Sequence, residues 1–399
     1  MALLAGCSLG RDGCPGRSCH HRRVFQAGEF AALSEEAAVV RLHVATTVDW
    51  ELARKVATRA GARKPFAQAA TTDPTLAADF AELTAQAEQL VAAETGLVSL
   101  AGPARAQVAD RAMWVDANVA SFRRLLRPLL EKIEPKVSSS RLTPVARRVS
   151  GIELGVMLGW MSTRVLGQYD LLVVEEEDPH LQDIVYYVGP NVAAMERRYA
   201  FPPREFRLWL ALHETTHRAQ FTGVPWLRHH FLSLVDLLLE NVEPDTKRLV
   251  DAFHMVLEKK RAGEDPMADG GVMGLLATPE QRDALERIGG MMSLLEGHGD
   301  ITMDRAGAHL IPSAPRFSRV LKQRRQETRG LVKFLQRLIG LDAKIQQYAQ
   351  GEQFILAVEA AGGANLLNTV WQSPDRLPTI HEIRQPQLWI DRITSPIPA

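Results

Sequence analysis

The sequence of 399 residues predicts a mainly α-helical protein, with a small β-hairpin or sheet directly before one central helix. Long stretches carry apolar residues at helical spacing, and Gly or Pro separates them. Two short runs, residues 171–174 and 184–188, instead read as strands. The run at residues 204–221 then returns to helical spacing and contains neither Gly nor Pro. Apolar and charged contents of 46% and 24% are those of an ordinary globular protein.

The first 44 residues are expected to be a disordered or misassigned arm. They hold all three cysteines (Cys7, Cys14 and Cys19), so the folded body has no disulfide framework. Residues 4–7 read LAGC, which imitates a lipoprotein cleavage box, but the basic start and long apolar stretch that export needs do not precede it. We therefore expect a cytoplasmic protein.

Four helices are expected between the arm and the strands. A polar stretch at residues 132–142 contains Pro135 and suggests a boundary between a helical subdomain (residues 45–135) and a metal-binding domain (residues 142–399). One continuous domain over residues 45–399 is the alternative. Glycines recur every four residues in the last of the four helices, which predicts close helix packing. The expected helices lie within residues 35–60, 76–93, 114–133 and 145–166.

The acidic turn EEEDPHLQD is expected to join the two strands, and residues 189–191 (GPN) to close the second. Beyond the central helix we expect helices at residues 227–242 and 245–260, and then a loop at 262–277 that could cover the site. Pro279 should open a helix that reaches Glu296. The basic stretch at residues 318–348 is interpreted as a solvated face, and the tail from Trp371 is expected to wrap the body.

The central run contains His213, Glu214 and His217 in an H-E-x-x-H pattern. Residues four apart share one helix face, so both imidazoles are aimed at one point where a zinc ion could bind. Glu214 lies beside them, placed to accept a proton from a zinc-activated water. The alternative is a helix whose two histidines bond only to solvent or neighbours.

A third ligand is expected in the segment MMSLLEGHGD, residues 291–300. Glu296 and Asp300 are four apart and would share a helix face. This spacing fits a carboxylate ligand, Glu296, followed by an acid, Asp300, that hydrogen-bonds the other ring nitrogen of a ligand histidine. His298 is the alternative ligand, because imidazole is also a common zinc donor. A polar helix end with a glycine stop is the remaining interpretation.

Several runs together resemble the bacterial zincin-like metallopeptidase family, whose members are often labelled as candidate hydrolases or as associated with biosynthesis of the deazaflavin coenzyme. The resemblance covers residues 48–393. It implies a mostly helical zincin-related fold, zinc on His213, His217 and Glu296, and Glu214 as catalytic acid and base. The runs are PPREFRLWLALHETTHRAQFTGVPWL, LGWMSTRVLGQYDL, YYVGPN, MSLLEGHGD and VWQSPDRLPTIHEI.

The predicted function is therefore that of a zinc-dependent hydrolase, a metallopeptidase acting on a peptide or protein with Glu214 as general base. One alternative is an inactive protein in which zinc staples two helices and the surface binds a partner. Another is a helical interaction protein without metal. Lys plus Arg and Asp plus Glu both number 47, and no apolar run is long enough to span a membrane, so neither nucleic acid nor membrane is an expected partner. Candidate oxyanion donors are Tyr169, Tyr199, His298, Arg305 and His309.

Overall fold

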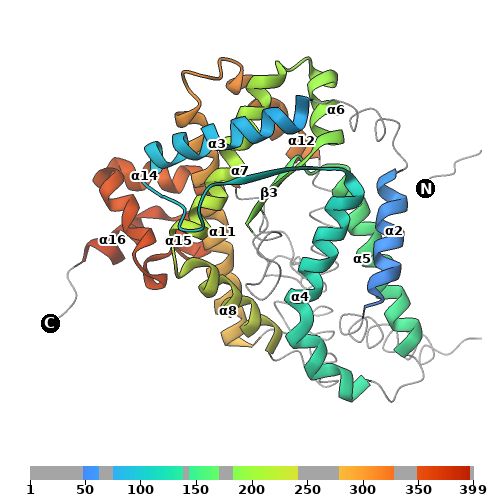
Figure 1. The fold of residues 1–399 in the computed structure, drawn as a ribbon. Helices are drawn as coiled ribbons and strands as arrows, with labels where there is room; N and C mark the ends of the chain where they lie inside the picture. The colour runs from blue at the N-terminus through green and yellow to red at the C-terminus, as the bar shows by residue number, and fades with distance from the viewer. Residues whose placement is uncertain are drawn as a thin grey trace, which may run out of the picture.

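The computed structural model describes residues 48–62, 75–137, 143–169, 183–240, 278–327 and 348–395 (Figure 1). Within these ranges the chain is mainly helical and has one three-stranded sheet, as the sequence predicts. Several predictions lie outside the described residues: the arm with its cysteines, the first strand of the hairpin, the helix at 245–260, the loop at 262–277 and most of the basic stretch at 318–348.

The N-terminal helices agree with the expected ones to within a few residues at most ends. They are α2 (Trp50–Ala62), α3 (Thr75–Thr95), α4 (Arg111–Val137) and α5 (Thr143–Ser162). Helix α4 is the exception, because it continues to Val137, although a polar link containing Pro135 was predicted from residue 132 onward. Glu131, Lys132 and Glu134 are polar but good helix formers, and polarity alone does not end a helix.

Helix α5 lies against α2 through its repeated glycines. A Cβ at Gly151 or Gly155 would come within 2.6 Å of a backbone oxygen of the α2 region, and one at Gly159 within 2.6 Å of the Ala60 side chain. The predicted role of these glycines in close helix packing is therefore confirmed.

The sheet has the order β1-β3-β2, with β1 (Arg105–Ala109) parallel and β2 (Gly167–Tyr169) antiparallel to β3 (Ile184–Val188). Strand β3 has the predicted bounds, and all five of its residues are buried. The sequence did not reveal β1. Residues 189–191, expected to be a turn, begin helix α6 instead, because the fixed φ of Pro190 suits a first helical turn.

Helix α7 (Pro203–Gly223) follows α6 and is buried along most of its length. Its apolar side chains enter two hydrophobic clusters, one shared with α3 and the sheet, the other with the C-terminal helices. Figure 1 shows α7 and α3 together above α11 and α8. The remaining elements are α6 (Gly189–Tyr199), α8 (Leu227–Glu240), α11 (Pro279–Ala306), α12 (Ala314–Glu327), α14 (Tyr348–Leu367), η2 (Asn368–Trp371), η3 (Pro374–Arg376), α15 (Ile380–Arg384) and α16 (Pro386–Thr394).

Two buried arginines fix α7 on either side of the motif. Arg207 donates to Glu196 at 2.9 Å and to Asp79 at 2.6 Å. Arg218, only 1% exposed, pairs with Asp183 at 2.6 Å and with Glu88. A buried charge is tolerated when it is paired in this way, whereas removing one partner typically costs about 3–5 kcal/mol.

The C-terminal tail packs on α11 and α14, which confirms that it wraps the body. The Trp389 indole donates to the Arg376 carbonyl oxygen at 2.8 Å. Arg392 donates to Glu382 at 2.6 Å. Burial alone would raise the pKa of Glu382, but the hydrogen bonds from Arg392 and Thr379 and the charge of Arg392 together outweigh it, and the pKa lies below its usual value. The tail is thus held by both apolar and ionic contacts.

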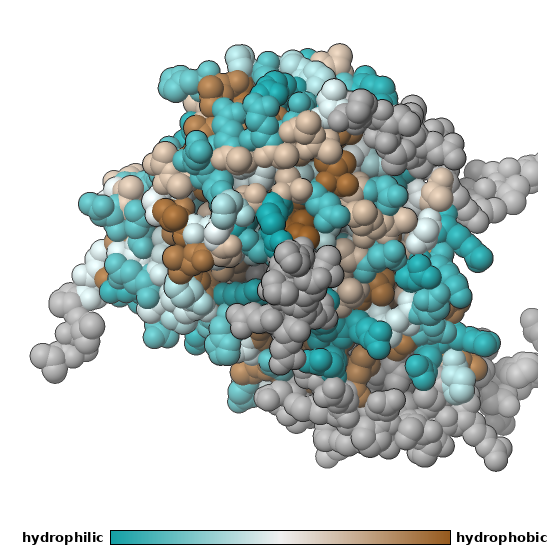
Figure 2. Space-filling view, in the orientation of Figure 1, coloured by the Kyte–Doolittle hydropathy of each residue, from teal (hydrophilic) through white to brown (hydrophobic). Residues whose placement is uncertain are grey.

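The division into two domains stays a prediction. Contacts within the described ranges cross the proposed boundary, since β1 pairs with β3 and α3 packs on α7. None of the helices in the described ranges combines the length and the apolar character needed to cross a bilayer. The face seen in Figure 2 mixes hydrophilic and hydrophobic side chains, with the hydrophobic ones in small separate groups.

Adjacent glycines on α11 give a matched test of this packing. A Cβ at Gly290 would lie 2.1 Å from the Pro378 carbonyl oxygen, whereas one at Gly289 would lie 3.5 Å from Ile380. Gly290→Ala should lower the free energy of unfolding by about 1–3 kcal/mol through overpacking. Gly289→Ala should leave it unchanged or raise it by up to about 1 kcal/mol, because Ala favours helix. Urea unfolding measures both; equal effects would contradict the described contact.

Candidate metal centre

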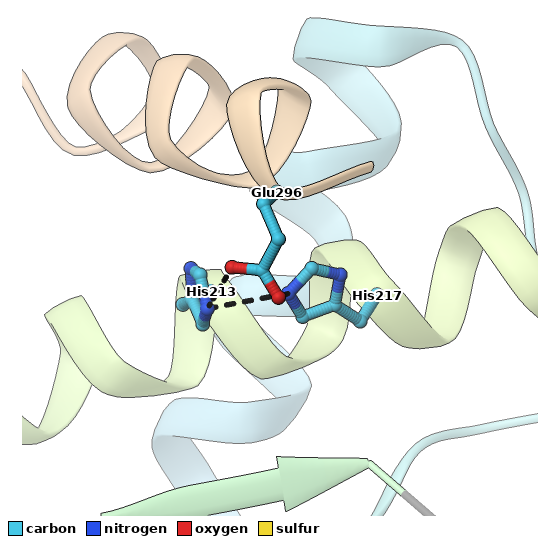
Figure 3. Close-up of side chains that lie close together, drawn as sticks. All are labelled: His213, His217 and Glu296. Atoms are coloured by element: carbon cyan, nitrogen blue, oxygen red, sulfur yellow. Dashed lines mark hydrogen bonds and ion pairs between the residues drawn. The ribbon is translucent and has the colours of Figure 1, made fainter. Parts of the chain in front are cut away.

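The three predicted ligands lie together at the crossing of α7 and α11 (Figure 3). One ligand atom from each of His213, His217 and Glu296 can be chosen so that all lie within 4.8 Å of one another. The two Nε2 atoms are 3.2 Å apart. The Glu296 carboxylate oxygens lie 4.0 Å from Nε2 of His213 and 3.8 Å from Nε2 of His217.

These residues fit a zinc ion. Two nitrogens bound at about 2.1 Å with tetrahedral angles would be about 3.4 Å apart, close to the separation found between the two imidazoles. Figure 3 shows Glu296 entering from α11 between the two rings of α7. The three side chains remain 15–21% exposed, so a small molecule can reach the point they share. Among the described residues, this is the group of three with ligand-like spacing.

Glu214 is held by the edge strand β2. The backbone N–H of Tyr169 donates to Oε2 of Glu214 at 3.1 Å. Gly167 on the same strand lies so close that a Cβ there would be 2.7 Å from Cγ and from Oε1 of Glu214. Strand β2 therefore anchors one carboxylate oxygen of Glu214 and needs glycine at position 167 to make room for the side chain.

Asp300 lies on the side predicted for the residue that orients a ligand. Its Oδ1 is 4.0 Å from Nδ1 of His213, the ring nitrogen that faces away from the metal point. This distance is too long for a direct hydrogen bond, but it brings a carboxylate next to the imidazole. Negative charge beside Nδ1 favours a proton there and leaves Nε2 free to bind metal.

His298 points elsewhere. Helix α11 does not stop at the glycines but continues to Ala306, so the glycine-stop interpretation is wrong. In a continuous helix residues two apart are about 200° apart around the axis, so Glu296 and His298 cannot face one ion together. Nδ1 of His298 lies 3.0 Å from Nε2 of Gln220, and its ring packs edge-on against Trp371. Burial lowers the pKa of His298 to about 4, so the ring is neutral near pH 7.

The two glycines of the segment EGHGD face different neighbours: Gly297 faces helix α14, and Gly299 faces the ligand histidines. A Cβ at Gly297 would lie 2.3 Å from the backbone of Gly351, which sets the approach of α14. A Cβ at Gly299 would lie 3.4 Å from both ligand rings, in ordinary van der Waals contact, so the two imidazoles come close to α11 at this glycine. A longer side chain at position 299 would have to displace them.

The other candidate oxyanion donors are engaged elsewhere or lie at the surface. Tyr169 is half-buried, and burial first, then the carboxylate of Asp183, raise the pKa of its phenol. Tyr199 stacks on Phe201 at 5.5 Å. Arg305 donates to Glu359 at 2.8 Å, and His309 is exposed. The oxyanion donor therefore stays unassigned.

Two residues at the site were not found from the sequence. The amide oxygen of Gln220 lies 3.0 Å from Nδ1 of His217, within hydrogen-bonding distance. Gln220 is three residues after His217, on the same face of the helix, and that spacing could have revealed it. Gly167 gave no comparable signal, because its neighbour Glu214 is distant in sequence.

Known proteins provide an independent comparison. The sequence model of a zincin-like metallopeptidase family matches residues 48–390. A solved structure from Chloroflexus aurantiacus, described as a "putative hydrolase with a novel fold", is 32% identical with a TM-score of 0.67. The match covers 88% of this chain and 100% of that one. No curated protein sequence matches the chain.

The contact between β2 and Glu214 can be tested by amide hydrogen exchange. Gly167→Ala should push the Glu214 side chain away, so that the Tyr169 amide loses its acceptor. A hydrogen bond to a charged group is worth about 1.5–3 kcal/mol, so exchange at Tyr169 should accelerate by about tenfold or more. Glu214→Gln is the matched control, because it keeps an acceptor oxygen and the glycine. Unchanged exchange in Gly167→Ala would refute the contact.

Proposed function

The chain belongs to the zincin-like metallopeptidase family, and we propose that it is a zinc-dependent hydrolase that cleaves peptide bonds. The observation that carries this proposal is the convergence of His213, His217 and Glu296 at one partly exposed point. Two imidazoles and a carboxylate are a common ligand set of catalytic zinc sites. The similar hydrolase from Chloroflexus aurantiacus supports the hydrolase part of the proposal.

Zinc held there would act as a Lewis acid and would lower the pKa of water towards about 7. The chain itself supplies the proton transfers. Glu214 is adjacent to a ligand histidine and is only 7% exposed, and Tyr169 holds one of its oxygens. In this proposal its other oxygen takes the proton of the attacking water and later returns a proton to the leaving amine. Asp300 and Gln220 orient the two imidazoles meanwhile.

The position of β2 supports a peptide substrate. Among the described strands, β2 is at one edge of the sheet, beside Glu214. Val188 donates to the Leu166 carbonyl oxygen, so alternation along the strand turns the backbone groups of Gly167 and Tyr169 away from β3. An extended peptide can add to such an edge by backbone hydrogen bonds, here through outward groups other than the Tyr169 N–H, which donates to Glu214. We propose that the substrate runs along β2, past the base.

A purely structural zinc site is the competing function. Structural sites are usually closed by four protein ligands, whereas catalytic sites keep one position for water or substrate. In the described part of the chain the cluster offers three ligand residues, and His298 faces Gln220 instead. This arrangement favours an open site over a closed one.

Metal analysis tests the ligand set. Purified protein should contain about one zinc ion per chain. Glu296→Ala should lose most of it, because the remaining two imidazoles bind zinc far more weakly, whereas exchange of the exposed His309 for Ala should lose none. Elemental analysis after gel filtration gives the ratio. If the parent protein contains no zinc, the proposal of a zinc enzyme is refuted. If Glu296→Ala retains zinc, Glu296 is not a ligand.

Turnover tests the role of Glu214. Glu214→Gln keeps the size of the side chain but cannot accept the proton, so cleavage should fall by about 10²–10⁴-fold while zinc content stays the same. The assay is mass-spectrometric detection of new termini in a mixture of unfolded proteins. Thr215→Val is the matched control, because that hydroxyl bonds to the Ala211 carbonyl of its own helix. Equal cleavage by Glu214→Gln and parent would exclude Glu214 as the base or expose a contaminating peptidase.

A further inference from the structure

The side chain of Gln220 connects α7 and α11, the two helices that carry the proposed metal ligands. Gln220 is on α7, three residues after His217, and its side chain is fully buried. The amide oxygen lies 3.0 Å from Nδ1 of His217. The amide nitrogen lies 3.0 Å from the carbonyl oxygen of Leu295 and 3.0 Å from Nδ1 of His298, both on α11. One side chain therefore contacts a ligand histidine, a second histidine and the backbone next to Glu296.

The orientation of this amide follows from chemistry. The Leu295 carbonyl oxygen can only accept, so the NH₂ group of Gln220 must face it. The amide oxygen is then turned towards His217. The opposite orientation would place two acceptor oxygens against each other in a buried position, where an unsatisfied polar group is costly.

The amide orientation decides the tautomer of His217. Because the Gln220 oxygen only accepts, Nδ1 of His217 must carry the hydrogen. A neutral imidazole has a single N–H, so Nε2 keeps its lone pair. Nε2 is the atom that faces His213 and Glu296 in the cluster. Gln220 thus holds His217 in the tautomer that can bind metal through Nε2.

The same amide sets the opposite tautomer in His298. One N–H of the Gln220 amide goes to Leu295, and the other is directed at Nδ1 of His298. That nitrogen must therefore be the acceptor, and the hydrogen of the neutral ring is on Nε2. The two histidines are thus held in different tautomers by the two ends of one side chain.

We propose that Gln220 is a positioning residue that fixes opposite tautomers of His217 and His298 and ties α7 to the α11 backbone beside Glu296. Its effect on metal affinity rests on the proposed function, whereas the tautomer assignment does not. Gln220 would act through His217, as partners behind metal-ligating histidines generally do. It would also preserve the separation of the ligand-bearing helices, because Leu295 immediately precedes Glu296.

The test uses ¹⁵N-histidine NMR on the zinc-free full-length protein, whose ring nitrogen shifts report each tautomer. In the parent, His217 should be the Nδ1–H form and His298 the Nε2–H form. In Gln220→Glu both carboxylate oxygens accept, so His217 should keep its tautomer whereas His298 should switch to Nδ1–H. In Gln220→Met, a size-matched apolar variant, neither tautomer should be fixed, and both rings should show mixed populations.

Zinc affinity, from competition with a chromophoric chelator, provides the second readout. Gln220→Met should bind zinc about 10–100-fold more weakly. Gln220→Glu should recover part of that loss, because it still accepts from Nδ1 of His217. Thr216→Val is the control: this buried residue is next to His217, but its hydroxyl bonds to the Leu212 carbonyl of its own helix, so tautomers and affinity should not change.

The outcomes separate the two proposals. A parent that binds no zinc refutes the proposed function, yet its tautomers still test Gln220. A parent with Nε2–H on His217 overturns the inference, and so does a Gln220→Glu variant whose His298 keeps its tautomer. If Gln220→Glu does not fold, the mixed populations expected in Gln220→Met decide the question. Equal zinc affinity in Gln220→Met and parent would remove Gln220 from the metal centre.

Discussion

The crossing of α7 and α11 is the constraint on which the rest of the structure depends. His213 and His217 on α7 direct their ring nitrogens at one position for a metal ion. The third ligand, Glu296, comes from α11 and must reach the same position to within a few tenths of an ångström. Gly299 allows the α11 backbone to lie against both rings. Gly297 in turn lets Gly351 of α14 press on α11 from another side. A side chain at Gly297 would push α11 away from α14 and move Glu296 with it, and a long side chain at Gly299 would displace the imidazoles.

Helix α7 is equally constrained, by polar contacts as well as apolar ones. Arg207 and Arg218 connect its two ends to α3, α6 and the start of β3 through buried ion pairs. Such pairs are weak evidence for net stability, because desolvation offsets much of the attraction. They do fix the position of α7, because a shift of the helix would leave buried charges without partners. The small sheet adds the last restraint, since the edge strand β2 holds Glu214. Ligands and base therefore lie on regular elements, which position side chains more accurately than loops.

The sequence predicted what depends on local periodicity. The spacing of His213 and His217 is a property of a single helix, and so is the shared face of Glu296 and Asp300. His298 was an alternative ligand because imidazole is a common zinc donor, and the glycines on either side of it suggested a helix end. Their actual role is to admit neighbouring helices, which a single sequence cannot reveal. Strand β1 was missed for a similar reason: its RAQVA sequence is only weakly apolar, and it is a strand because it pairs with the buried β3.

The segment EGHGD shows how one helix can serve several partners in five residues. Successive positions turn by about 100°, so each of them faces a different neighbour. Glu296 meets the ligand histidines, Gly297 meets α14, His298 meets Gln220, Gly299 lies under the imidazoles, and Asp300 comes beside His213. Glu296 brings its carboxylate to the ring nitrogens that face the shared point, whereas the carboxylate of Asp300 lies behind His213, beside Nδ1. Like charges in a partly buried site repel one another, and a divalent cation removes that repulsion. The packing that fixes α11 therefore also brings the negative charge of Glu296 to the point where the two imidazole lone pairs converge, which favours a cation there over an unliganded site.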